Sequence, residues 1–123
     1  MSLAKNGKKD PLILAQVVRD EKWEKLLGRS VRVRHHLVPI ILCSSIKFDG
    51  GECAGCYSAI ERAIYIDITS DCAWETFMHE FIHAEISEGG LRQHPDWCEK
   101  LEEIVCETLA VGLLANFRFR RLK

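Results

Sequence analysis

The chain has 123 residues, 47% of them hydrophobic and 28% charged, and its formal net charge is -1. This length suits one hydrophobic core, and the composition excludes a wholly disordered chain. The near-neutral charge gives no overall attraction to nucleic acid, although both ends of the chain are locally basic. The longest apolar run, 37–43, is far shorter than the ~20 residues of a membrane span. We therefore expect a single domain over 10–123 that follows a flexible segment over 1–9.

The N-terminal ten residues contain lysines but no apolar stretch before a small-residue cleavage site, which is unlike a secretory signal. This predicts a cytoplasmic protein whose six cysteines stay reduced. Cys53 and Cys56 form one C-x-x-C pair, whereas a structural zinc site needs four ligands. A second metal there would need Cys43 or Cys72 as well, and the simpler interpretation is a bend between strands.

Apolar residues recur at helical spacing after Asp10-Pro11 and stop at Gly28, which predicts a helix over 11–27 that could break near Asp20. In the middle third, short apolar runs and alternation of apolar with polar residues predict strands over 31–34, 40–43, 46–48, 57–60 and 63–68. The last two of these strands should form a hairpin about Glu61-Arg62. Two more helices are predicted, over 72–88 and, opening at Pro95, over 95–117. This order indicates an α+β domain with a small antiparallel or mixed sheet.

One motif carries recognisable chemistry: His79-Glu80-Phe81-Ile82-His83, the pattern HExxH. Residues four apart lie on one face of a helix, so both imidazoles can bind one ion. Glu80 lies beside that ion and can take a proton from a water held there, because zinc lowers the pKa of such a water to near 7. The alternative interpretation is a helix with solvent-exposed His and Glu side chains.

A catalytic zinc site needs a third protein ligand. The last helix offers three glutamates at spacing four, Glu99, Glu103 and Glu107, on a stripe that continues with apolar residues. Carboxylates that enter a buried stripe are costly unless they are paired or bound to a metal. Glu103 is favoured, and Glu107 could instead bind the metal or orient one of the histidines.

His79 to His83, followed by Glu103 and the segment 109–113 (LAVGL), resembles the gluzincin-type metallopeptidases and is more closely similar to small phage and prophage HExxH proteins related to the ImmA/IrrE type. The resemblance covers about 57–117 and implies a minimal zincin-like domain, zinc as cofactor and Glu103 as third ligand. It departs from the family pattern at Cys106, where Ala is usual. Because Glu107 with Ala110 also fits the short pattern, the choice between the two glutamates stays open.

A rival resemblance involves His94-Pro95-Asp96-Trp97 and Leu101, which look somewhat like a segment of the SprT-type proteases. Those enzymes act on DNA-associated proteins and use a His as third ligand, which would be His94 here. The spacing from His83 is shorter than in that family, and Pro95 replaces a Gly. Otherwise His94 would cap the helix that Pro95 begins.

These patterns predict a zinc metalloendopeptidase with Glu80 as general base, which would cleave a protein or peptide substrate. An edge strand near 54–59 could pair with an extended substrate. A group that stabilises the oxyanion is expected, the candidates being Tyr57, Tyr65, Arg92 and His94. The alternative from another class is a non-catalytic, zinc-stabilised regulatory module, which would have no need of Glu80. Nucleic acid is expected only through the substrate, and no membrane partner is expected.

Overall fold

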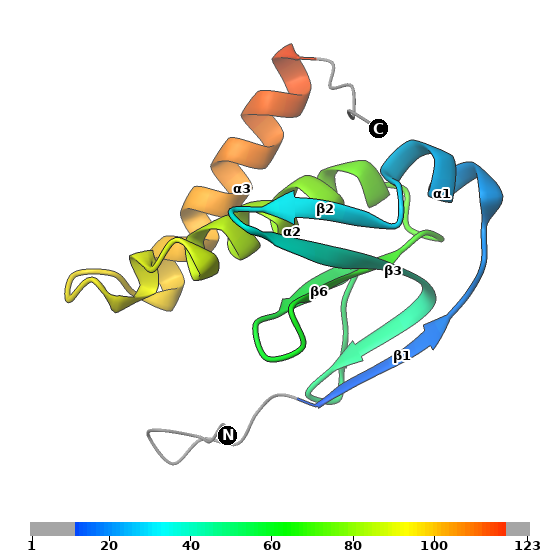
Figure 1. Cartoon of the computed structure of the whole chain (residues 1–123), viewed down its shortest axis with the longest axis horizontal. Helices are drawn as coiled ribbons and strands as arrows, with labels where there is room; N and C mark the ends of the chain where they lie inside the picture. Colours follow the sequence, from blue (N-terminus) through cyan, green and yellow to red (C-terminus); the bar gives the residue numbers. More distant parts are fainter. Residues whose placement is uncertain (1–11, 118–123) are drawn as a thin grey trace.

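The structure is a computed structural model that describes residues 12–117 (Figure 1), so the segment predicted to be flexible, 1–9, lies outside it. Its elements follow in the order β1 (Ile13–Val17), α1 (Glu21–Leu27), β2 (Ser30–Val33), β3 (His36–Phe48), β4 (Gly51–Glu52), β5 (Gly55–Ser58), β6 (Ala63–Asp67), α2 (Ala73–Glu88), the 3-10 turn η1 (Leu91–Gln93) and α3 (Glu99–Asn116). The domain is α+β with a mixed sheet, as the sequence predicts.

The sheet is organised around β3, which pairs with four other strands. Its first part pairs antiparallel with β2, its middle parallel with β6, and its end antiparallel with β1 and β4. The predicted strands 40–43 and 46–48 are one continuous strand here, and Pro39, which lies before the predicted start, falls inside it. Proline has no N–H to donate to a neighbouring strand. The strand tolerates it because Pro39 lies opposite Ser30 of β2, and the pairing with β6 begins only at the next residue, Ile40.

The prediction of one helix over 11–27 is wrong in its first half. Residues Ile13–Val17 form β1, which pairs with the end of β3, and the helix begins only after Asp20. The Asp20 carboxylate accepts a hydrogen bond from the Trp23 backbone N–H at 3.0 Å, which is an N-cap. The apolar side chains of 13–18 fit the two-residue period of a strand as well as the 3.6-residue period of a helix. Pairing with β3 decides in favour of the strand.

The hairpin about Glu61-Arg62 is present, with β5 antiparallel to β6 and Arg62 at φ 51° in the turn, but β5 begins two residues earlier than predicted. The last helix starts later than predicted. Pro95 lies in a loop after η1, and the Cys98 thiol accepts from the Leu101 N–H at 3.4 Å at the start of α3.

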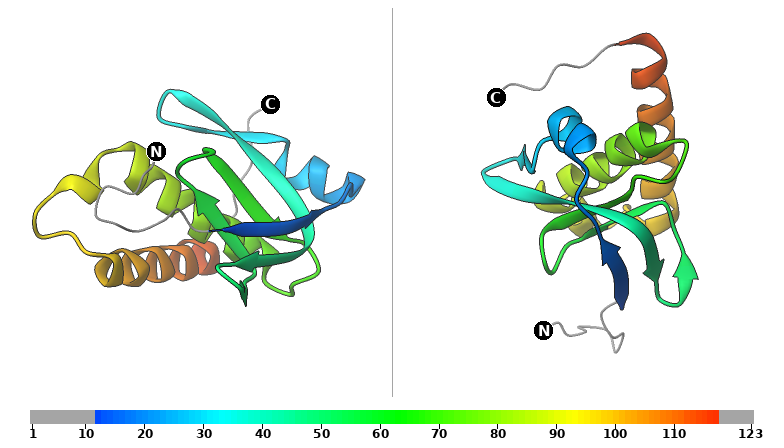
Figure 2. Two further views of the ribbon diagram at one scale, coloured as in Figure 1. Left: turned by 90° about the horizontal axis from the view of Figure 1, so that it is seen from below. Right: turned by 90° about the vertical axis from the view of Figure 1, so that its right-hand side faces the viewer.

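Helix α2 lies between the sheet and α3 (Figure 2). Its apolar face, Trp74, Phe77, Phe81 and Ala84, packs into a core formed with β2, β3 and β6. It ends at Gly89 and Gly90, and Gly90 adopts φ 80°, a conformation that suits glycine. The predicted helix 72–88 is therefore confirmed, and packing of its apolar face turns the histidines toward α3. Within 12–117, no helix combines the length and the apolar content of a membrane span.

Candidate metal centre and cleft

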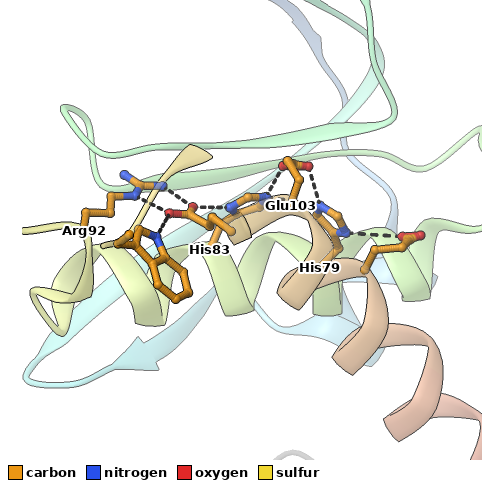
Figure 3. Close-up of polar contacts among 7 residues, drawn as sticks. His79, His83, Arg92 and Glu103 are labelled. Atoms are coloured by element: carbon orange, nitrogen blue, oxygen red, sulfur yellow. Dashed lines mark hydrogen bonds and ion pairs between the residues drawn. The ribbon is translucent and has the colours of Figure 1, made fainter. Parts of the chain in front are cut away.

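Two histidines on α2 face one carboxylate on α3 (Figure 3). The Nε2 atoms of His79 and His83 lie 3.1 Å apart. The two oxygens of Glu103 lie 2.7 Å from His83 Nε2 and 3.5 Å from His79 Nε2. Ligand atoms bound tetrahedrally at ~2.0–2.1 Å from zinc are about 3.3 Å apart, so these contacts have the scale of a zinc donor set.

The chemistry of these atoms also fits a cation. Glu102 Oε2 lies 2.5 Å from His83 Nδ1, and since a carboxylate only accepts, Nδ1 carries the proton. In the neutral imidazole, His83 Nε2 is then an unprotonated acceptor that faces a second carboxylate. Either a second proton or a metal ion must lie between these acceptors, and the set of two imidazoles and a carboxylate suits zinc.

Glu102 is the residue of the site that sequence reasoning missed. Only 5% exposed, it accepts two hydrogen bonds from Arg92, at 2.9 and 2.7 Å, and one from the Trp97 indole at 3.1 Å. Burial alone would raise its pKa, but the bonds from Arg92, His83 and Trp97 outweigh burial and lower it to about 2. Glu102 therefore stays ionised and holds His83 in one orientation, as carboxylates behind metal-binding histidines do.

Glu107 lies on the other side of the pair. Its Oε1 is 3.5 Å from His79 Nδ1, so it faces the back of the ring, away from the meeting point of the two Nε2 atoms. Glu103 thus faces the Nε2 atoms of both histidines, whereas Glu107 contacts only the Nδ1 side of His79. Both side chains are more than half exposed, 55% and 65%, so this flank of the centre opens to solvent.

Glu80 is buried between α2 and β5, with 8% of its surface exposed. Burial raises the pKa of its carboxyl to about 7, against the lowering effect of His83 and of a hydrogen bond from the Tyr57 backbone N–H. Its oxygen lies within 4.8 Å of donor atoms of His79 and His83. The carboxyl thus lies beside the histidine pair and can exchange a proton near neutral pH.

A cleft of about 1230 Å³ runs along this centre, lined by β5, by the loop that precedes it and by the start of α3. Among residues 12–117, β5 pairs with β6 alone, so no described strand covers its other edge. The predicted edge strand, 54–59, thus corresponds to β5 and borders the cleft that contains His79, Glu80 and His83.

The four candidates for oxyanion stabilisation differ in their location and in their hydrogen-bond partners. Tyr57 and Arg92 line the cleft, but the Tyr57 hydroxyl donates to Glu88 at 3.0 Å and Arg92 is held by Glu102. Tyr65 belongs to the cluster on the far side of the sheet and donates to Glu61. His94 is exposed, and its Nδ1 accepts from the Asp96 N–H at 3.1 Å, so it caps a turn in the loop and lies apart from the histidine pair.

The cysteines form no comparable centre. All six are free thiols, and among residues 12–117 no group of three metal-binding side chains within 4.8 Å contains Cys53 or Cys56. Cys56 and Cys43 are buried together, while Cys72 is exposed at the start of α2. A second such group, His83, Glu102 and Cys106, does meet that limit. Burial raises the pKa of the Cys106 thiol to about 12, and Arg92 already occupies Glu102, which disfavours metal binding there.

Comparison with family models, curated proteins and solved structures finds no match to this chain.

Proposed function

We propose that this protein is a zinc-dependent endopeptidase with Glu80 as general base. The observation that carries the proposal is the meeting of His79 Nε2, His83 Nε2 and both oxygens of Glu103 in front of a cleft. These three residues would hold the ion. When bound, zinc supplies a Lewis acid that activates water near neutral pH and polarises a carbonyl.

Glu80 would accept a proton from the attacking water and return it to the departing amine nitrogen. Its burial beside the histidine pair supports this role, because burial raises the pKa of the carboxyl and so helps it to hold the proton that it accepts. A purely structural zinc site would need neither this buried carboxyl nor the adjoining cleft, which favours an enzyme over a zinc-stabilised module.

The substrate would be an extended segment of a protein or peptide, paired with the unpaired edge of β5. Main-chain hydrogen bonds along a strand edge recognise any extended polypeptide, whereas the cleft's side chains select among them. The proposed endopeptidase thus follows from the juxtaposition of an edge strand and a metal-binding helix.

The test compares zinc content and cleavage of an unfolded protein such as casein, after chelation and reloading with zinc. We expect Glu80→Gln to retain zinc but to lose cleavage by about 10²-fold or more, the contribution of a general base. His79→Ala should lose both zinc and cleavage, and Glu75→Gln, exposed on the first turn of α2, should lose neither. Absence of zinc uptake by the wild type, or undiminished cleavage by Glu80→Gln, would overturn the proposal.

A further inference from the structure

The cleft along the metal centre has a local excess of acidic side chains. The described residues that line it include one arginine, no lysine and six glutamates: Glu52, Glu61, Glu80, Glu99, Glu102 and Glu103. The whole chain, in contrast, has 17 basic and 18 acidic residues, so the excess belongs to the cleft and not to the composition. A cleft lined by charges of one sign concentrates ligands of the opposite sign.

The two arginines nearest to the cleft are held by other carboxylates. Arg92 donates to both oxygens of Glu102, so these two lining charges offset each other. Arg62 follows Glu61 in the turn between β5 and β6, but its Nε atom lies 3.3 Å from Glu88. The excess of negative charge along the cleft is therefore not offset by these arginines.

Glu52 and Glu61 lie at the two ends of the edge strand β5. Glu52 comes three residues before Gly55–Ser58, and Glu61 comes three residues after it. Both side chains are exposed, and within residues 12–117 neither forms an ion pair with a Lys or Arg. Lys47 lies opposite Glu52 in the β3–β4 pairing but does not line the cleft, and the Tyr65 hydroxyl that donates to Glu61 is uncharged. Each end of β5 thus has a carboxylate that no described cation pairs with.

Two further features of the cleft indicate that its ligand is a polypeptide. No described strand covers the outer edge of β5, so the main-chain groups along this edge can pair with an added strand. Glu80, with only 8% of its surface exposed, lines the cleft beside this edge. A polypeptide paired with β5 would extend past both ends of the strand, toward Glu52 and Glu61.

We propose that the cleft selects extended polypeptide segments that carry a Lys or Arg on each side of the part that pairs with β5. Glu52 would bind one basic side chain and Glu61 the other, so both residues determine specificity. An exposed ion pair changes affinity by only about 2–5-fold, and the selection comes from two such pairs acting together. The inference rests on the proposed function, because it specifies the substrate of the same cleft.

The test is the binding of two labelled peptides to the full chain carrying Glu80→Gln, which prevents turnover, with zinc added. Both peptides have blocked ends and the same uncharged core, long enough to span β5, and they carry either Lys or Glu on both sides of this core. We expect the Lys peptide to bind about 10-fold more tightly or better at low salt, measured by fluorescence anisotropy. The preference should shrink as added salt screens the charges.

Neutral variants locate the selection. Glu52→Gln with Glu61→Gln should remove most of the preference. Glu21→Gln with Glu75→Gln, which removes two exposed carboxylates outside the cleft, should keep it. Circular dichroism checks that each variant is folded. The inference is overturned if neither peptide binds, if both bind equally, or if the two pairs of substitutions reduce the preference to the same extent.

Cleavage by the zinc-loaded wild type separates this inference from the proposed function. Cleavage of both peptides with the same kcat/KM would overturn the selection and leave the endopeptidase in place. Selective binding of the Lys peptide without cleavage of any peptide would overturn the endopeptidase and leave a cleft that binds basic polypeptides.

Discussion

Glu102 lies 2.5 Å from the Nδ1 atom of His83, on the side of the ring away from Glu103. A carboxylate from the third helix thus determines which nitrogen of an HExxH histidine can bind a metal. Three further donor groups, two from Arg92 and one from Trp97, hold that carboxylate in place.

Replacement of Glu102 should therefore weaken metal binding without removing a ligand. We expect Glu102→Gln to lower zinc affinity by about 10–100-fold, the usual cost of losing a carboxylate behind a metal-binding histidine. Competition with a chromophoric chelator measures the affinity. Glu99→Gln, at an exposed position on the first turn of α3, is the matched control and should bind zinc like the wild type. Equal affinities of the two variants would contradict an orienting role.

The same carboxylate predicts an acid-dependent loss of stability. Its pKa is lowered from 4.5 to about 2 in the folded chain, so it contributes to the free energy of unfolding above its ordinary pKa. This contribution is lost as the pH falls from about 4.5 toward about 2. Denaturant unfolding of zinc-free protein between about pH 6 and about pH 3 should therefore show the wild type approaching Glu102→Gln in stability. A constant difference between them would contradict the assignment.

The three candidate third ligands predict an order of effects. Glu103→Ala should cut zinc affinity most, because Glu103 alone among them faces both Nε2 atoms. Glu107→Ala should cost less, about 10–100-fold, since it contacts only the back of His79. His94→Ala should leave zinc bound. Zinc content after gel filtration checks the order, and loss of zinc in His94→Ala alone would favour the SprT-like interpretation.

Gly55 is predicted to be required where β5 meets α2. A Cβ atom there would lie 2.4 Å from the Thr76 methyl and 2.8 Å from the Tyr65 carbonyl oxygen, both too close. We expect Gly55→Ala to destabilise the fold by about 1–3 kcal/mol, the cost of overpacking. Thr76→Ser in the same chain removes the methyl group and should restore part of the lost stability. The rescue should be incomplete, because the close contact with the Tyr65 carbonyl oxygen remains. Gly51→Ala, with its nearest contact at 3.7 Å, should change the free energy of unfolding little.

Much of the fold follows from local sequence, and the errors arise where distant residues decide. Helix α2 has clear apolar periodicity and a Gly-Gly end, so it could be predicted closely. Residues 13–17 have no such local signal, because their apolar side chains fit a strand and a helix equally well. Their partner, the end of β3, lies some thirty residues away, and pairing with it overrides the helical spacing.

The site divides in the same way. His79, Glu80 and His83 form a local motif, so spacing alone placed them on one helix. Glu102 and Glu103 are adjacent in sequence, and only the crossing of α3 over α2 decides which of them faces His83 Nδ1 and which faces Nε2. The guanidinium and indole donors that hold Glu102 come from the preceding loop, whose path no periodicity describes.

The middle of β3 has a consequence for how the molecule opens. Residues 40–43 pair with β6 on one side, while on the other the Ile40 N–H bonds to Arg29 and the Leu42 carbonyl accepts from Val18. No single strand can therefore peel away and leave this segment without hydrogen bonds to a neighbour. Its amide protons should exchange with deuterium only when the whole domain unfolds, whereas the edge strand β5 can open in small, frequent excursions. The part of the sheet beside the cleft would thus be dynamic, while the centre of the sheet stays closed.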